Sequence, residues 1–337
     1  GTDEYNKKEA EQYRYFTDRY LKYIEKYGKT PRMWGGLKWL PGKTPVKAEG
    51  VTVNAWSYDW VDPEVSLKDG YKLINTCDTY LYIVPGAGYY REFLDHQWLY
   101  ETWTPWMINR KQTLPEGTPG VLGGMFAVWN DYIGNGITFK DIHHRAYPAM
   151  QTLSLKMWTG AVDDLSFARF DSCRRALSEA PGVNIGAKVK TMDGKVLQVS
   201  KLKRNQKLLI EEVGYDYEVA FDFTAKSADK GSVLFKSSNA ILYQSSPKSG
   251  KLAFWSDGYL NEFDYMFPIG QRVQIVIKGD HTSTSLYIDG KLHQTLDKKI
   301  LYKIGEEVVY YQSTLVFPLA FTGNFSGQLL NLKVLQK

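Results

Sequence analysis

The chain has 337 residues, and its 42 lysines and arginines exceed its 37 aspartates and glutamates, which gives a formal net charge of +5. This mild balance gives no reason to expect a nucleic-acid or membrane-surface protein, and two cysteines are too few for a disulfide scaffold or a four-cysteine zinc site. No apolar run approaches the ~20 residues of a membrane span, and the polar opening residues predict no signal peptide. We therefore expect no membrane span, no metal and no cofactor.

The aromatic content is high and unevenly distributed. The chain carries 10 tryptophans, 24 tyrosines and 15 phenylalanines. Nine of the ten tryptophans precede residue 160, and only Trp255 follows. The length favours two domains, and the uneven tryptophans indicate that the two domains do different work.

The first half of the chain alternates helical and extended patterns. Residues 6–27 predict an amphipathic helix ended by Gly28, with these residues at three- and four-residue steps: Ala10, Tyr13, Phe16, Tyr20, Ile24 and Tyr27. Four apolar runs predict buried strands at 32–37, 51–56, 72–84 and 121–129. Further helices are predicted at 89–109, 139–157 and 162–180. Strands that alternate with helices favour β/α units around a parallel sheet.

After Pro181 the period of the apolar residues changes to two. Tyr217, Val219, Phe221 and Phe223 alternate with polar residues, and Gly-containing turn dipeptides recur at short intervals. Short alternating strands with such turns predict an antiparallel β-sandwich. We therefore expect an α/β domain over residues 1–180 and an all-β domain over residues 181–337.

Two adjacent carboxylates open the chain, in Gly1-Thr2-Asp3-Glu4, directly before the first predicted helix. The pair has two interpretations. Acidic residues are favoured in the first turn of a helix by the helix dipole, so capping alone could explain them. The alternative is a catalytic pair, and residues at the ends of the later strands favour that alternative.

Aromatic and acidic residues follow the predicted strands at the ends where β/α barrels place their working residues. These residues are Trp34, Trp56, Tyr80, Tyr82, Trp129 and Asp131. Any one of them could be a packing residue, but a core rarely needs an aromatic residue at the same end of four successive strands. The apolar face of a sugar ring stacks on aromatic rings, and its hydroxyls need carboxylate acceptors. The pattern therefore predicts a sugar site.

With these residues the sequence resembles glycoside hydrolase family 20, the β-N-acetylhexosaminidase and lacto-N-biosidase family. The family's catalytic Asp-Glu pair ends barrel strand four after a Gly-containing turn, as in Gly1-Thr2-Asp3-Glu4. Its strands five and six each supply a pocket tryptophan, its strand seven a tyrosine, and its strand eight ends in Trp-x-Glu or Trp-x-Asp. The resemblance covers about residues 1–160, with these matches: Trp34, Trp56, Tyr80 or Tyr82, and Trp129 with Asp131.

The resemblance implies a substrate-assisted mechanism, in which the 2-acetamido oxygen of the sugar attacks C1. Glu4 would be the general acid and then the base, while Asp3 would stay ionised and orient the acetamido group. Tyr80 or Tyr82 would bind the acetamido oxygen, and both are expected on the same face of one strand. The other matched residues would bind the substrate: Trp34, Trp56, Trp129 and Asp131.

The resemblance covers half of a barrel. A complete TIM barrel has eight strands in roughly 250 residues, whereas this sequence matches the end of strand four through strand eight. We therefore expect the C-terminal half of a (β/α)8 barrel, a fragment that is inactive without the missing N-terminal half as its partner. The resemblance further implies a glycan substrate with terminal N-acetylhexosamine and a secreted, cell-surface or periplasmic bacterial enzyme.

The second half resembles the laminin-G and concanavalin-like (jelly-roll) sandwich, most clearly where the run 285–288 enters the turn Asp289-Gly290. This pattern specifies a fold more than a ligand. Trp255, Tyr259 and Tyr265 form either a glycan-binding face or part of a core or interface.

Two functions from different classes follow. The leading interpretation is a glycosidase fragment that removes terminal β-linked N-acetylhexosamine, or a related disaccharide, from glycans. The alternative is a non-catalytic carbohydrate-binding or structural module with a degenerate half-barrel. Asp3-Glu4 discriminates between them, because a protein that only binds sugar has no need of such a pair opposite a strand-seven tyrosine.

Overall fold

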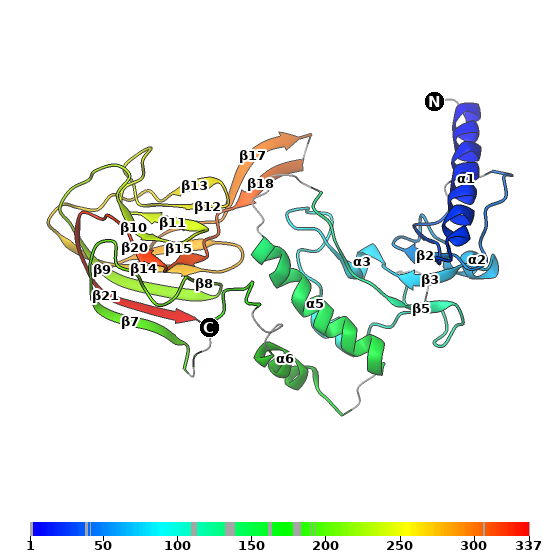
Figure 1. The fold of residues 1–337 in the computed structure, drawn as a ribbon, viewed down its shortest axis with the longest axis horizontal. Helices are drawn as coiled ribbons and strands as arrows, with labels where there is room; N and C mark the ends of the chain where they lie inside the picture. The colour runs from blue at the N-terminus through cyan, green and yellow to red at the C-terminus, as the bar shows by residue number, and fades with distance from the viewer. Residues whose placement is uncertain are drawn as a thin grey trace. The chain divides into compact units, whose positions relative to one another are not determined.

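The computed structural model divides into two compact units, residues 1–131 with 145–178 (unit 1) and residues 132–144 with 179–337 (unit 2). For residues 3–6, 304, 307 and 309 the structure describes the backbone alone. Figure 1 shows the elements of both units along the chain. The described residues are 3–37, 40, 42–108, 113–131, 139–160, 164–177, 183–189, 191, 193–305 and 307–336.

Unit 1 is built on parallel strands, and each of the four expected runs contains a strand. The main sheet has the order β1-β2-β3-β5 with all neighbours parallel. The short strands β4 and β6 form a second parallel pair. Every residue of β2 is buried, as is typical of a parallel strand covered on both faces. The bounds are β1 (Arg32–Trp34), β2 (Thr52–Ala55), β3 (Lys72–Asn75), β4 (Tyr82–Ile83), β5 (Val121–Gly124) and β6 (Ala127–Val128).

Some helices of the first half are shorter than the sequence predicts. The helix expected at 89–109 is limited to α4, where the Asp95 side chain accepts a hydrogen bond from Trp98 N. Pro105 follows soon after, and it both lacks an N–H and disfavours helical backbone at the preceding residue. The bounds are α1 (Asp3–Lys26), α2 (Pro63–Lys68), α3 (Asp78–Leu81), α4 (His96–Glu101), α5 (Phe139–Thr159) and α6 (Phe167–Ala176).

The expected single strand at 72–84 is wrong, because the chain leaves the sheet after Asn75. The side chain of Asn75 is fully buried, and it hydrogen-bonds to loop backbone at the point where the strand ends. Its Nδ2 donates to the carbonyl oxygens of Pro105 and Met107 at 3.0 and 2.9 Å, and its Oδ1 accepts from Cys77 N at 3.0 Å. The chain then makes the single turn α3 before it enters β4.

Helix α1 buries one residue of the face that the spacing predicts, Ala10, together with Leu21 from outside that face. Polar side chains attach the helix to the following loop. Arg14 Nε donates to the Thr44 carbonyl at 2.8 Å, and Lys47 N donates to the Asp18 carboxylate at 2.9 Å. The predicted aromatic face is more than half exposed instead: Tyr13, Phe16, Tyr20 and Tyr27.

Unit 2 contains two antiparallel sheets, with strand orders β16-β15-β14-β9-β21-β7 and β13-β12-β11-β10-β20 (Figure 1). Two further pairs, β17 with β18 and β19 with β8, complete the strands. The bounds are β7 (Lys195–Leu202), β8 (Glu212–Val213), β9 (Tyr217–Ala225), β10 (Val233–Lys236), β11 (Ala240–Tyr243), β12 (Ala253–Ser256), β13 (Tyr259–Glu262), β14 (Arg272–Gly279), β15 (Thr284–Ile288), β16 (Lys291–Leu296), β17 (Lys298–Ile304), β18 (Glu307–Gln312), β19 (Phe317–Pro318), β20 (Phe321–Thr322) and β21 (Gly327–Gln336).

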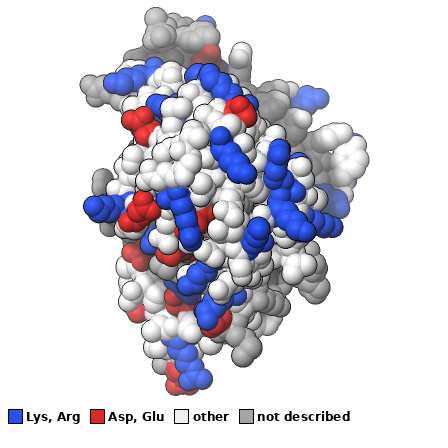
Figure 2. Space-filling model, turned by 90° about the vertical axis from the view of Figure 1, so that its left-hand side faces the viewer, with Lys and Arg blue, Asp and Glu red and all other residues white. Residues whose placement is uncertain are grey.

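The two sheets of unit 2 share one apolar core, so this unit has the architecture of a β-sandwich. Phe221 of β9 and Phe235 of β10 lie 5.5 Å apart between ring centroids, and Phe235 is equally close to Phe317. Alternating burial along β14 matches the period-two pattern in the sequence. On the face that Figure 2 shows, lysine and arginine are interspersed with acidic and uncharged residues. The concanavalin-like topology stays a prediction.

Replacing Asn75 by alanine is expected to lower the free energy of unfolding of unit 1 by about 3 kcal/mol. The change leaves two buried carbonyls and one N–H without the partners described above, and each unsatisfied group costs about 1–3 kcal/mol. Urea denaturation followed by tryptophan fluorescence measures the effect, since nine of the ten tryptophans lie before residue 160. Gln97→Ala removes an exposed amide from the same unit and should cost less than about 0.5 kcal/mol. Equal losses in the two variants would contradict this account of Asn75.

Candidate functional site

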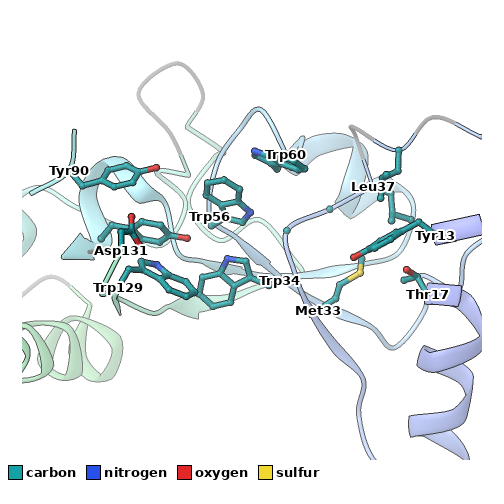
Figure 3. A pocket seen from close by; sticks show the side chains of 14 residues that line it. Tyr13, Thr17, Met33, Trp34, Leu37, Trp56, Trp60, Tyr90, Trp129 and Asp131 are labelled. Carbon is teal, nitrogen blue, oxygen red and sulfur yellow. The ribbon is translucent and has the colours of Figure 1, made fainter. Parts of the chain in front are cut away.

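A cavity of about 570 Å³ opens where the strands of unit 1 end (Figure 3). Trp34 is the last residue of β1, and Trp56 directly follows β2. Tyr82 begins β4, and Trp129 follows β6. The other lining residues come from α1, from Met33 of β1 and from the loops: Tyr13, Thr17, Met33, Gly35, Gly36, Leu37, Leu40, Trp60, Tyr90 and Asp131.

The aromatic rings of the cavity pack on one another around Tyr82. The Trp56 ring is stacked parallel to Tyr82, with centroids 6.2 Å apart and an interplanar angle of 10°. The Trp129 ring is tilted against Tyr82 at 5.8 Å and meets the Trp34 ring edge-on at 5.3 Å. Trp60, which sequence analysis left without a role, stacks on Trp56 at 5.7 Å. The result is a wall of indole faces and edges with one phenol among them.

The Tyr82 hydroxyl is the polar group among these rings. Burial raises the pKa of Tyr82 well above its usual range, and the neighbouring Trp34 and Trp129 side chains oppose that rise only in part. The phenol therefore stays protonated near neutral pH, and its own O–H remains to donate to an acceptor on a ligand.

Tyr80 and Tyr82 occupy different environments, so the expectation that they share one strand face is wrong. Tyr80 lies in α3, and its ring stacks on Trp98 at 4.5 Å. Tyr80 does not line the cavity, whereas Tyr82 does. The helical turn between them, which follows from the break at Asn75, rotates Tyr80 away from the position that an unbroken strand would give it.

Two tyrosines that sequence analysis missed hold the acidic residues near the cavity. Tyr89 donates its hydroxyl to Asp131 at 2.8 Å. Tyr90 donates to Asp78 at 3.0 Å, and burial, with a smaller contribution from the Asp78 charge, raises the pKa of Tyr90 to about 12. The signal was present in Gly86-Ala87-Gly88-Tyr89-Tyr90, a glycine-flanked aromatic pair like those at the other strand ends.

Asp3 and Glu4 lie in the first turn of α1, which begins three residues earlier than the sequence predicts. Their side chains fall outside the described residues, so their catalytic roles stay a prediction. Tyr13 of the same helix lines the cavity. At 1.5 Å per residue, Tyr13 is about 13 Å further along the helix axis than Glu4.

Other classes of site find no support in the described part of the chain. No group of three or more histidine, cysteine, aspartate or glutamate side chains could hold a metal ion among the described residues. Cys77 is buried, and burial raises its pKa to about 11, so it is a poor nucleophile. None of the described helices combines the length and apolar character that a membrane crossing requires.

Replacing Gly35 by alanine is expected to displace the Trp56 ring and to lower the free energy of unfolding by about 1–2 kcal/mol. Gly35 has φ +74°, which strains any other residue, and an added Cβ would lie 3.0 Å from Trp56 Nε1. Near-UV circular dichroism reports the stacked indoles, and urea denaturation reports stability. Gly88→Ala is the matched control, since a Cβ there meets nothing within 4 Å. An unchanged near-UV spectrum for Gly35→Ala would show that the glycine does not position Trp56.

Residues 2–161 match the family model described as glycosyl hydrolase family 20, catalytic domain. No curated protein matched the chain. The family match supports a glycosidase in general, and it covers the segment that carries the aromatic cavity.

Several solved structures resemble part of the chain at low identity. Domain 4 of AbnA, an extracellular arabinanase from Geobacillus stearothermophilus solved with arabinotriose, is 15% identical with a TM-score of 0.26, over 38% of this chain and 63% of that one, which is less than two thirds. The Caenorhabditis elegans galectin LEC-6 is 8% identical with a TM-score of 0.29, over 41% and 94%. The Ruminococcus gnavus IT-sialidase CBM40, bound to α2,3-sialyllactose, is 16% identical with a TM-score of 0.26, over 43% and 93%. TM-scores this low carry no argument about fold or ligand, so the family match over residues 2–161 is what connects this chain to known proteins.

Proposed function

We propose that this chain is part of a glycoside hydrolase that removes terminal β-linked N-acetylhexosamine, or a related disaccharide, from glycans by substrate-assisted retaining catalysis. The observation that carries the proposal is the Tyr82 hydroxyl, which lies among the aromatic walls of the cavity and stays protonated, so that it can donate to a ligand. The match of residues 2–161 to the family 20 catalytic domain supports the same class of reaction.

The cavity supplies the contacts that an acetamido sugar needs. The C–H face of the pyranose stacks on an indole, and Trp34, Trp56 and Trp129 enclose the ring and the acetamido methyl. Tyr82 donates its O–H to the acetamido carbonyl oxygen, which orients that oxygen toward C1 of the same sugar. Asp131, already held by Tyr89, accepts hydrogen bonds from outer hydroxyls. Attack of the acetamido oxygen at C1 then forms a bicyclic oxazolinium ion.

The acid-base steps fall to the Asp3-Glu4 pair, by the resemblance of the sequence to family 20. Glu4 donates a proton to the departing glycosidic oxygen and afterwards removes one from the water that opens the oxazolinium ring. Asp3 stays ionised, accepts the acetamido N–H and stabilises the developing positive charge. These roles require the first turn of α1 to give way to extended backbone. The ends of helices open at low cost in free energy, because their first N–H groups have no partners within the helix.

The proposal includes a partner that supplies the other β/α units of a barrel. Within the described residues β1 pairs only with β2, so its other edge is open. Beside it, α1 exposes a row of touching rings, with 4.8 Å between Phe16 and Tyr20 and 5.0 Å between Tyr23 and Tyr27. Further β/α units that pack there would pair the open edge of β1 and bury the aromatic side chains of α1. A glycan substrate also agrees with a secreted or cell-surface bacterial enzyme.

A non-catalytic carbohydrate-binding module is the second candidate. The helical backbone at Asp3 and Glu4, where a family 20 enzyme would have the end of a strand, favours it. On that interpretation the aromatic cavity binds the sugar and no bond is cleaved. The two candidates share the same ligand and differ only in whether Glu4 transfers a proton.

Tyr82→Phe is expected to weaken the binding of methyl β-N-acetylglucosaminide about tenfold or more, because the acetamido oxygen loses its hydrogen-bond donor. Calorimetric titration of the full chain measures the affinity. Tyr80→Phe removes the same atom from a ring outside the cavity lining and should leave the affinity unchanged. Methyl β-glucoside, which lacks the acetamido group, should bind the parent more weakly. Equal affinity of the parent for both glycosides would contradict an acetamido-specific site.

Glu4→Gln is expected to lower kcat on a chromogenic N-acetylglucosaminide by roughly 10²–10⁴-fold, since general acid-base catalysis contributes that much. The measurement uses the chain together with a polypeptide that supplies the other β/α units, because we expect no turnover by the chain alone. Glu9→Gln removes an exposed carboxylate from the same helix and should leave kcat unchanged. Activity that is equal in Glu4→Gln and the parent would favour the binding module, and turnover by the pure chain would overturn the partner requirement.

A further inference from the structure

A second cavity, of about 220 Å³, lies in unit 2 at one end of the five-stranded sheet. Two hairpin turns form it, the β10–β11 turn at 237–239 and the β12–β13 turn at Asp257-Gly258, together with residues at the start of α5. Figure 1 shows these strands side by side in the sandwich. The cavity is separate from the site proposed above, because none of its lining residues lines the cavity of unit 1.

One wall of this cavity is the indole of Trp255. In β12 the residues on either side of Trp255 are buried, while Trp255 itself is 37% exposed, so its side chain stands on the outer face of the sheet. Ile241 of β11 and Leu260 of β13 are its direct partners in the register, and they flank the indole on that face. The ring is therefore supported by aliphatic side chains and offers a flat apolar surface. The tryptophan sits where a ligand can stack on it.

A fixed amide lies on the rim. Asn239 Nδ2 donates to Glu212 at 2.9 Å, and Glu212 also accepts from Ser237 Oγ at 2.9 Å. Glu212 is buried and forms an ion pair with Lys140 of α5. The positive charge of Lys140 is thus balanced within the wall, and the amide of Asn239 is oriented by a buried carboxylate rather than by solvent.

A carboxylate completes the rim. Asp257 lies at φ +54° in the two-residue turn with Gly258, a geometry typical of a tight β-hairpin. Ser256 Oγ donates to Asp257 Oδ2 at 2.7 Å, which fixes the carboxylate. Burial raises the pKa of Asp257, because it removes water from around the charged carboxylate. Hydroxyl groups of a ligand that donate hydrogen bonds there stabilise the charged form in place of that water.

The geometry points to a second ligand site at this cavity, one that binds a neutral sugar ring of a glycan. The apolar C–H face of a pyranose stacks on Trp255, while its hydroxyls donate to Asp257 and exchange hydrogen bonds with Asn239. An anionic sugar is disfavoured, since Lys140 is already paired with Glu212 and Asp257 is the remaining charge on the rim. The small volume suits a single sugar ring rather than an extended chain. On this proposal unit 2 binds a glycan at this cavity without cleaving it.

The test uses the full chain labelled with 5-fluorotryptophan, in which the ¹⁹F signal absent from Trp255→Phe identifies Trp255. Titration with lactose, cellobiose and chitobiose should shift the Trp255 signal for at least one sugar. Asp257→Asn, which keeps the shape of the side chain, and Asn239→Ala should each weaken that response about tenfold. Because the readout is at Trp255 itself, it does not depend on whether the cavity of unit 1 binds or hydrolyses sugar.

Two controls fix the interpretation. Phe321→Ala removes another exposed ring, which contacts Lys236 on the same sheet but lies outside the cavity, and should leave the Trp255 response unchanged. Glucuronic acid should shift the Trp255 signal less than the neutral sugars do. No shift of the Trp255 signal with any of the three disaccharides would overturn the proposal, as would a response that Asp257→Asn and Asn239→Ala leave at the parental strength.

Discussion

The site in unit 1 depends on the packing of aromatic rings from distant strands around one buried phenol, Tyr82. Trp34 ends β1 and Trp129 follows β6, which continues from β5, and β1 and β5 are the outer strands of the main sheet. Neighbouring strands lie about 4.8 Å apart, so a flat sheet would separate the outer two by about 14 Å. The Trp34 and Trp129 rings are nevertheless 5.3 Å apart, and Trp129 also packs on Tyr82 at 5.8 Å. The long indole side chains therefore bring residues from the two edges of the sheet together over its centre.

That arrangement rests in turn on how the chain leaves β3. Had the strand continued from Asn75, Tyr80 and Tyr82 would share a face and Tyr80 would compete for the cavity. Instead the buried Asn75 side chain satisfies the carbonyls of Pro105 and Met107, and a helical turn follows. A single amide therefore contributes to which phenol lines the cavity. The same loop carries Trp103, which packs so closely on Gly124 of β5 that a Cβ there would lie 2.4 Å from the ring.

Sequence patterns predict the parts of this protein that repeat a simple rule. Four apolar runs gave the positions of the parallel strands, and period-two alternation gave the antiparallel sheets of unit 2. Aromatic residues beside loop residues identified Trp34, Trp56 and Trp129 as cavity residues. The choice between Tyr80 and Tyr82 was not predictable, because it depends on contacts of Asn75 with residues thirty positions away. Those contacts leave no periodic signal.

The prediction of the buried face of α1 was inaccurate for a different reason. The three- and four-residue spacing of its aromatic residues is real, but spacing records which residues share a face and not what covers it. In this chain the aromatic part of that face is exposed, while Arg14 and Asp18 on a neighbouring side of the helix are held by hydrogen bonds to the loop. The spacing of residues along a helix therefore does not by itself predict which side is buried.

Asp3 and Glu4 can lie either in the first turn of a helix or at the end of a strand. The free energies that favour each position decide between them. In the first turn of a helix, acidic residues gain about 0.3–1 kcal/mol from the helix dipole, and little else holds that turn together. The aromatic face of α1 includes Phe16, Tyr20 and Tyr23, each more than half exposed, and full burial of a large apolar side chain is worth about 1.5–3 kcal/mol. On the proposed function, a partner that covers these rings and adds a strand beside β1 would therefore gain more than the unwound turn costs. The proposal thus gives Asp3 and Glu4 a helical position in the lone chain and a strand-end position in the assembled barrel.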